Sequence, residues 1–180
     1  KIGMSSLVDK YVSQLADKLI KKGKDLVEEA LRTKTYEHDT YNLHDSYGAG
    51  VYYKGRLIRE YYNTPSKAKE PNLLHNGVFI YGEDDVKEYL RLGYKPNSSG
   101  LVLVVVATMP YGETLEKGVG LKRKYKVISQ ISSSTELVAN EFKGKVNTIG
   151  LWIKTIWNGM NENESGAVYL GHLQNMELVK

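Results

Sequence analysis

Two His-Asp pairs are the residues of this chain best suited to chemistry. His38-Asp39 and His44-Asp45 lie six positions apart within residues 36–55, a stretch that holds two of the four histidines. Imidazole and carboxylate groups are good ligands for zinc or iron. A small metal-dependent hydrolase that uses these four residues is therefore one hypothesis. Their spacing differs from the i, i+4 histidine pair of a helical zinc motif, and the other two histidines are distant in sequence.

The same residues also have a structural interpretation. Asp39 and Asp45 can cap turns while the imidazoles form local hydrogen bonds. No serine lies in a G-x-S-x-G pattern, and the glycines form no phosphate-binding loop. Glu113 and Glu116 are three apart, and we expect Glu116 to bond backbone amides or a lysine rather than to take part in glycoside chemistry. We therefore expect no enzyme activity, no cofactor and no bound metal.

Composition points to one folded domain of modest charge. The chain has 180 residues, a net charge of +4 and no cysteine, which excludes disulfides, thiolate metal sites and a cysteine nucleophile. It has no apolar run long enough to cross a membrane, and its start lacks the pattern of a signal peptide. Fourteen tyrosines against two phenylalanines are a strong bias. Tyrosine suits surfaces that meet other proteins, and it also simply favours strands.

A short basic run gives a third hypothesis, a binder of single-stranded nucleic acid. Lys and Arg side chains in this run could contact phosphates while Tyr125 stacks on a base. Most such runs are solvated strand or loop, and the net charge is far from that of a dedicated nucleic-acid binder. The basic residues are Lys122, Arg123, Lys124 and Lys126.

The apolar pattern predicts a long amphipathic helix over residues 5–33. Its apolar residues follow a 3/4 spacing with one skipped turn near Gly23, and lysines and aspartates occupy the other side. Ser5 or Ser6 can cap its start. Gly23 weakens the middle by about 1 kcal/mol relative to alanine, so we expect a bend there.

Short β-rich runs and shorter helices follow. A hairpin is expected at 47–62 around the turn Lys54-Gly55, and residues 101–107, apolar throughout, are expected to form a central strand covered on both faces. Residues 63–76 have the composition of a polar loop. The remaining expected elements are a short strand at 77–81, helices at 83–92, 111–118 and 133–142, and strands at 151–157 and 167–170.

The order of these segments, together with two short motifs, is more informative than any single residue. The long helix is followed by a turn T-x-N-L-x-D-S, formed by Thr40, Asn42, Leu43, Asp45 and Ser46. Much later the apolar strand ends in M-P-Y-G-E-T-L-E-K-G, residues 109–118. This arrangement resembles the tail-completion, or head–tail joining, family of tailed bacteriophages, whose members include minor tail and neck proteins.

Both motifs match the family pattern with one change each. The family turn is T-G-x-L-x-x-S, and Asn42-Leu43-His44-Asp45-Ser46 stands at its place, with Asn42 where glycine is usual. The later family signature is Y-A-x-x-x-E-x-G, with glycine replacing alanine in this chain. Its matched residues are Tyr111, Glu116 and Gly118.

The resemblance covers roughly residues 5–145 and implies a fold. We expect an α+β domain at 1–145, with an insertion at about 63–98 and a C-terminal extension at 146–180 that serves as a contact arm or as extra strands. The long helix and a second helix should pack on one face of a mixed or antiparallel sheet of about four strands, leaving the other face and the edges for neighbours. Within the second helix, Leu137, Val138, Ala139 and Phe142 are expected to be buried.

The motif residues have structural roles in this interpretation. Tyr111 would pack its ring beneath the sheet, Glu116 would bond backbone amides or a neighbour's basic group, and Gly118 would end its turn in a conformation that other residues resist. None of these roles is catalytic. The His-Asp pairs would then mark the joint between helix and sheet.

By resemblance, the protein is a structural component of a virion, assembled in the bacterial cytoplasm and located at the neck or tail. Roughly six or twelve copies would form a ring between the portal or connector and the tail proteins. The loop at 63–76 and the aromatic residues Trp152, Trp157 and Tyr169 are the expected contacts beyond the family core. The basic run at 122–126 could line a channel through which DNA passes.

Overall fold

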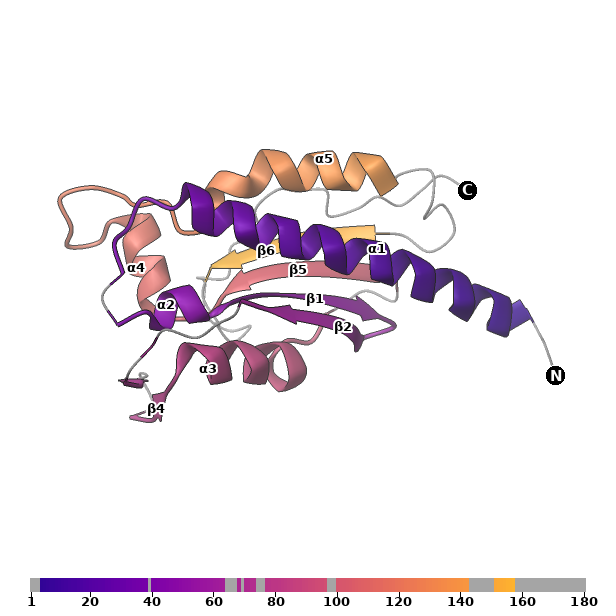
Figure 1. The fold of residues 1–180 in the computed structure, drawn as a ribbon, viewed down its shortest axis with the longest axis horizontal. Helices are drawn as coiled ribbons and strands as arrows, with labels where there is room; N and C mark the ends of the chain where they lie inside the picture. Colours follow the sequence, from indigo (N-terminus) through magenta and orange to yellow (C-terminus); the bar gives the residue numbers. More distant parts are fainter. Residues whose placement is uncertain are drawn as a thin grey trace.

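A four-stranded mixed sheet lies between two layers of helices in the computed structural model (Figure 1). The structure describes residues 4–38, 40–63, 68, 70–73, 77–96, 100–142 and 151–157. The strand order is β2-β1-β5-β6, antiparallel from β2 through β5, with β6 joining β5 in parallel. Its strands are β1 (Tyr47–Tyr53), β2 (Arg56–Tyr62), β5 (Leu101–Ala107) and β6 (Leu151–Trp157).

The centre of the sheet follows the predicted pattern. Strands β1 and β2 form the expected hairpin around Lys54-Gly55, with an irregular register between Val51 and Tyr52. Every residue of β5 is buried, as its continuous apolar run predicts for a strand covered on both faces. Strand β6 occupies the predicted range 151–157.

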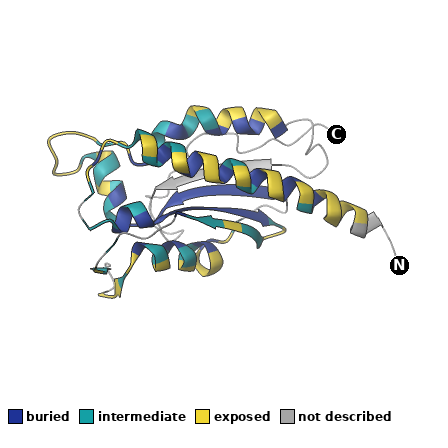
Figure 2. Cartoon of the chain, in the orientation of Figure 1, coloured by how far each residue is buried: buried dark blue, intermediate teal, exposed yellow. Residues whose placement is uncertain are grey.

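The first helical layer contains α1 (Met4–Thr33), a helix of 30 residues that packs on β1, β2 and β5. Gly23 has a different role from the expected bend, because it lets the helix approach the sheet closely. A β-carbon at this position would lie 2.9 Å from the Cβ of Ala49 and 3.1 Å from Cδ1 of Leu103. Figures 1 and 2 show that the N-terminal end of α1 projects past the sheet, where it is exposed.

Helix α5 (Ser132–Phe142) lies beside α1 on the same face, preceded by the 3-10 turn η2 (Ser129–Ile131). Val138, Ala139 and Phe142 are buried, as predicted. The prediction for Leu137 was wrong, because its side chain is 70% exposed. Helix α5 faces α1 and the sheet with the side that carries Val138 and Phe142, so Leu137 points to solvent.

The second face of the sheet is covered, which corrects the expectation that it is left for neighbours. Helix α3 (Gly82–Glu88) and the π-helical turn η1 (Tyr89–Gly93) pack on it (Figure 1). Both come from the segment interpreted as an insertion. A second buried apolar cluster holds them to the sheet, formed by Tyr52, Val86, Leu90, Tyr94, Val102, Val104 and Val106.

The α+β class with a long N-terminal helix is confirmed, and so is the packing of the second helix on the same face. Three of the strands make the antiparallel part of the sheet, and β6 adds the parallel fourth. Four small elements complete the described chain: α2 (Asn42–Asp45), β3 (Asn72–Leu73), β4 (Phe79–Ile80) and α4 (Tyr111–Lys117). Within the described residues, no helix combines the length and apolar character needed to cross a membrane.

Candidate functional site

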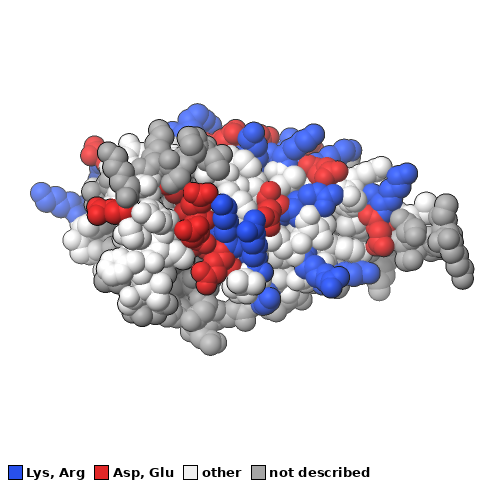
Figure 3. All heavy atoms as spheres, turned by 60° about the horizontal axis from the view of Figure 1, so that its bottom comes forward, with Lys and Arg blue, Asp and Glu red and all other residues white. Residues whose placement is uncertain are grey.

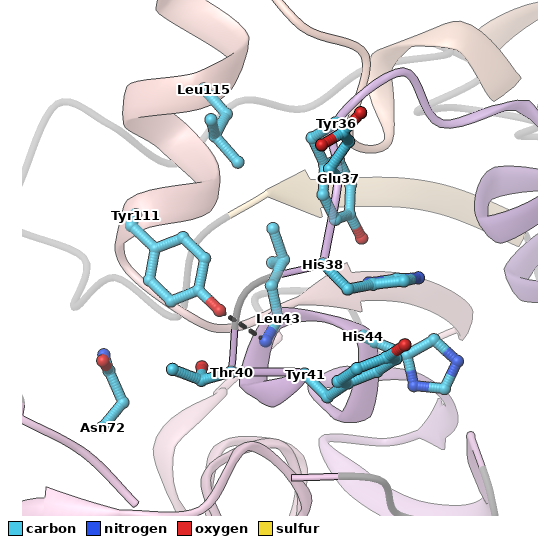
Figure 4. A pocket seen from close by; sticks show the side chains of 10 residues that line it. All are labelled: Tyr36, Glu37, His38, Thr40, Tyr41, Leu43, His44, Asn72, Tyr111 and Leu115. Atoms are coloured by element: carbon cyan, nitrogen blue, oxygen red, sulfur yellow. Dashed lines mark hydrogen bonds between the residues drawn. The ribbon is translucent and has the colours of Figure 1, made fainter.

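The two motifs meet at one joint between α2 and α4 (Figure 4). The backbone N–H of Leu43 donates to the hydroxyl of Tyr111, 68 residues further along the chain, at 2.7 Å. The Ser46 hydroxyl donates to the carbonyl of Leu43 at 2.8 Å and accepts from the backbone N–H of Met109 at 3.2 Å. Leu43, Ser46 and Tyr111 therefore form a single unit in which each motif fixes the other.

Asn42 ties this joint to the second helical layer. Its side chain is fully buried. Nδ2 donates to the carbonyl of Glu70 at 2.8 Å, and Oδ1 accepts from the backbone N–H of Gly82, at the start of α3, at 2.9 Å. Such a satisfied, buried amide specifies how α2 sits against α3.

Tyr41 has the backbone conformation that glycine favours. Its φ is 67° and its ψ is 1°, in the left-handed region. Counting the spacing T-G-x-L-x-x-S from Thr40 places Tyr41, and not Asn42, at the motif's glycine, so the earlier assignment of Asn42 was wrong by one position. The match then extends unbroken over Thr40 to Ser46. The motif spacing itself was the signal that could have identified Tyr41.

Glu116 forms the hydrogen bonds expected of it. Its Oε1 accepts from the backbone N–H groups of Val127, Ile128 and Ser129 at 2.9, 2.6 and 2.8 Å, and its Oε2 accepts from the Ser129 hydroxyl at 2.6 Å. The carboxylate thus holds the start of η2 against α4. Gly118 ends α4 with φ 69°, as predicted for a left-handed cap.

The second His-Asp pair is built into the scaffold. Asp45 is fully buried, and its Oδ1 lies 2.8 Å from Nδ1 of His44 while its Oδ2 accepts from the backbone N–H of Ala68 at 3.0 Å. The rings of His38 and His44 are 5.0 Å apart, edge to face. Across the residues that the structure describes, which leave out Asp39, no three or more His, Asp or Glu side chains are placed to share a metal ion.

A pocket of about 290 Å³ opens beside this joint, between α4 and the chain that leads into α2 (Figure 4). Among the described residues that line it, five carry rings and Glu37 is the one acidic residue. The ring of His38 stacks on that of Tyr41 with centroids 4.6 Å apart. The lining residues are Tyr36, Glu37, His38, Thr40, Tyr41, Leu43, His44, Asn72, Tyr111 and Leu115.

Buried tyrosines make one wall of the pocket rigid. The Tyr36 hydroxyl donates to the Tyr47 hydroxyl at 3.0 Å, which donates to the carbonyl of Val127 at 2.7 Å. Burial is the main cause that raises the pKa of Tyr36 and of Tyr47 above the usual value, so both stay protonated donors at any physiological pH. Sequence reasoning missed this pair, since tyrosine in a strand is the ordinary expectation.

The basic run lies on an exposed loop that follows α4. The C-terminal end of the run is held, because the backbone N–H of Lys126 donates to Thr35 Oγ1 at 2.7 Å. Within the run, the Arg123 guanidinium lies 4.8 Å from the centroid of the Tyr125 ring. Lys122 and Lys124 are exposed. On the face shown in Figure 3, Lys and Arg side chains are interspersed with Asp and Glu side chains, so neither sign of charge dominates that face.

The predicted contact residues near the C-terminus are only partly placed. Trp152 and Trp157 belong to strand β6, where Trp152 pairs with Val102 and Trp157 with Ala107 in the backbone register. Tyr169 and the expected strand at 167–170 lie outside the described residues. The loop contacts expected at 63–76 fall largely outside them as well.

Comparison with known proteins gives no relative. No protein-family model, no curated protein and no solved structure matches the chain. Function therefore has to be argued from the joint, the pocket and the surfaces that the fold presents.

Proposed function

We propose that this chain is a structural virion protein of a tailed bacteriophage, one subunit of a ring at the neck between the portal or connector and the tail. The observation that carries the proposal is the joint at Leu43 and Tyr111. Two motifs that resemble those of tail-completion proteins meet there, and the motif's glycine position, Tyr41, has a left-handed backbone. If the sequence match were due to chance, we would expect neither the contact between the two motifs nor the left-handed backbone at Tyr41.

The chemistry of the motif residues favours a scaffold over an active site. The Glu116 carboxylate is occupied by three backbone amides and a hydroxyl, and the Asp45 carboxylate by His44 and a backbone amide. Catalytic acids and bases need to reach a substrate. These side chains instead connect segments of the fold to each other.

Exposed apolar residues at opposite ends of the molecule suit a head-to-tail assembly. Leu7, 57% exposed, and Val8 lie on the projecting end of α1, whereas Val78 and Phe79, the latter 65% exposed, lie at the short β3–β4 hairpin at the other end (Figure 1). In a ring, each subunit contacts the next through two different surface patches. Such a head-to-tail contact forms a ring when the rotation between subunits closes. Exposed apolar groups of this kind commonly mark protein interfaces.

Quantitative mass spectrometry of purified virions tests the proposal. Particles from the phage or prophage that carries this gene would be measured with labelled standards for this chain and for the portal protein. A count of roughly six or twelve copies per particle, set against the portal protein, supports the ring. Absence from particles that retain the full portal complement would refute the role.

The basic loop has its own place in the proposal. Within a ring, Lys122, Arg123 and Lys124 could face the DNA that passes through the channel. Neutralising all three would then reduce DNA retention or ejection while the protein still enters the particle. Unchanged infectivity of such particles would remove DNA contact from the proposal without affecting the ring.

A further inference from the structure

The pocket beside α4 has a lining that suits a positively charged, planar group. Tyr36, His38, Tyr41, His44 and Tyr111 supply its rings. Ring faces carry a negative quadrupole that attracts cations, and the guanidinium of arginine also stacks on such faces. A cavity of about 290 Å³ has room for such a side chain, since a planar six-membered ring fits an engineered cavity of roughly half that volume.

Tyr41 reaches the pocket from a strained backbone. A bulky residue with φ 67° is an outlier, and such outliers concentrate at ligand clamps, where the surrounding structure enforces them. A glycine would adopt this turn without strain, but it would leave the pocket without a ring at this position. The strained backbone is therefore tolerated at this position because it places the Tyr41 ring in the pocket.

Charge selects a cation over a neutral ring. Glu37 is exposed at the pocket, and among the described residues that line it Glu37 is the only Asp or Glu and there is no Lys or Arg. Lys34 shows that a ring of this cluster attracts cations, since its Nζ lies 4.7 Å from the centroid of the Tyr36 ring. That contact occupies the Tyr36 ring, so the guanidinium would stack on the other rings of the pocket. A carboxylate next to aromatic rings matches guanidinium, which pairs with carboxylates through two parallel hydrogen bonds and stacks through its plane.

The walls are fixed before any ligand binds. Hydrogen bonds from Tyr36 to Tyr47 and from Leu43 to Tyr111 hold both sides, and the His38 ring is stacked on Tyr41. A preformed site loses little conformational entropy when it binds. We infer that this pocket binds the arginine side chain of a partner protein between its aromatic rings and the Glu37 carboxylate.

A titration of the full-length protein with blocked amino acids tests the inference. N-acetyl-arginine methylamide is the probe, and N-acetyl-citrulline methylamide is its control, with the same planar shape but no charge. The chain has four histidines, so its imidazole proton signals in an NMR spectrum are few enough to follow. We expect saturable shifts of two of these signals with the arginine probe, and roughly tenfold weaker binding of citrulline.

Two variants assign the binding to this pocket. Glu37→Gln should weaken arginine binding several-fold, whereas the matched change Glu136→Gln, at an exposed position on α5, should leave it unaltered. Tyr41→Gly should abolish saturable binding without loss of the fold, because glycine relieves the left-handed strain.

Three results would overturn the inference: equal binding of citrulline, equal binding of N-acetyl-lysine methylamide, or full binding by either pocket variant. This inference is independent of the ring proposal. The titration can fail while virions still contain the protein, and it can succeed in a protein that no virion contains.

Discussion

Replacing Glu116 by alanine should destabilise the fold far more than the same replacement of an exposed glutamate on a surface helix. The carboxylate is the acceptor for three backbone N–H groups at the start of η2, two of which belong to the fully buried residues Val127 and Ile128. A buried donor that loses its partner costs about 1–3 kcal/mol. Water can reach Ser129 more easily, so we expect a total loss of about 4 kcal/mol.

The same helix provides the control. Glu113 lies one turn before Glu116 and forms an ion pair with Lys117 at the surface of α4. An i, i+4 pair of this kind contributes about 0.3–0.5 kcal/mol. Glu113→Ala should therefore be nearly neutral, although it removes the same charge from the same helix.

Urea unfolding followed by circular dichroism measures both variants. With a slope of about 2 kcal/mol per molar urea, a loss of 4 kcal/mol lowers the midpoint by about 2 M, whereas Glu113→Ala should shift it by about 0.2 M. Hydrogen exchange adds a local readout, because the amides of Val127, Ile128 and Ser129 should lose protection first. If both alanine variants unfold within about 1 kcal/mol of each other, the carboxylate does not hold η2 as argued.

Three further changes test the packing. Burial raises the pKa of Asp85 to about 6, so its charge opposes folding as pH rises from roughly 4 through 6. Asp85→Asn should gain roughly 3 kcal/mol at pH 8 and almost nothing at pH 4, measured by urea unfolding at both values. Gly23→Ala should lose about 1–2 kcal/mol in the same assay despite its better helix propensity, since the new methyl group would crowd Ala49 and Leu103, and a stabilised variant would contradict the close approach. Tyr47→Phe removes a buried hydroxyl between two partners and should cost about 1–3 kcal/mol, seen as a lower thermal midpoint; an unchanged midpoint would show that this hydroxyl is dispensable.

The predictable parts of the fold are those that local patterns decide. The Lys54-Gly55 turn lies between two β-rich runs, and residues 101–107 are apolar throughout, so hairpin and central strand follow from the sequence. Gly118 and Glu116 were also predictable, because a family motif gave their positions. In each of these cases neighbouring residues, or a known pattern, carry the needed information.

The parts that could not be predicted depend on contacts distant in sequence. Leu137 and Val138 are adjacent and equally apolar, and only the position of α1 decides which of them is buried. The helix at 83–92 was predicted, but its place on the second face of the sheet was missed, because its cluster with β5 forms only once the sheet exists. The pocket gathers residues between 36 and 115 whose proximity no local pattern encodes.

The energetics of Tyr41 separate a structural role from a binding role. Its left-handed backbone costs roughly 1–2 kcal/mol, and stacking on the His38 ring returns roughly 0.5–1.5 kcal/mol. Within the isolated protein these terms nearly cancel, so Tyr41→Gly should change the free energy of unfolding by no more than about 1 kcal/mol. Urea unfolding of this variant measures the balance.

A loss of 3 kcal/mol or more in Tyr41→Gly would mean that the ring supports the fold and that the strain is offset by packing alone, as expected for a residue of the core. Near-neutral stability would mean that the fold does not need this tyrosine. Its ring would then have to be explained by what enters the pocket, which is the premise of the arginine titration.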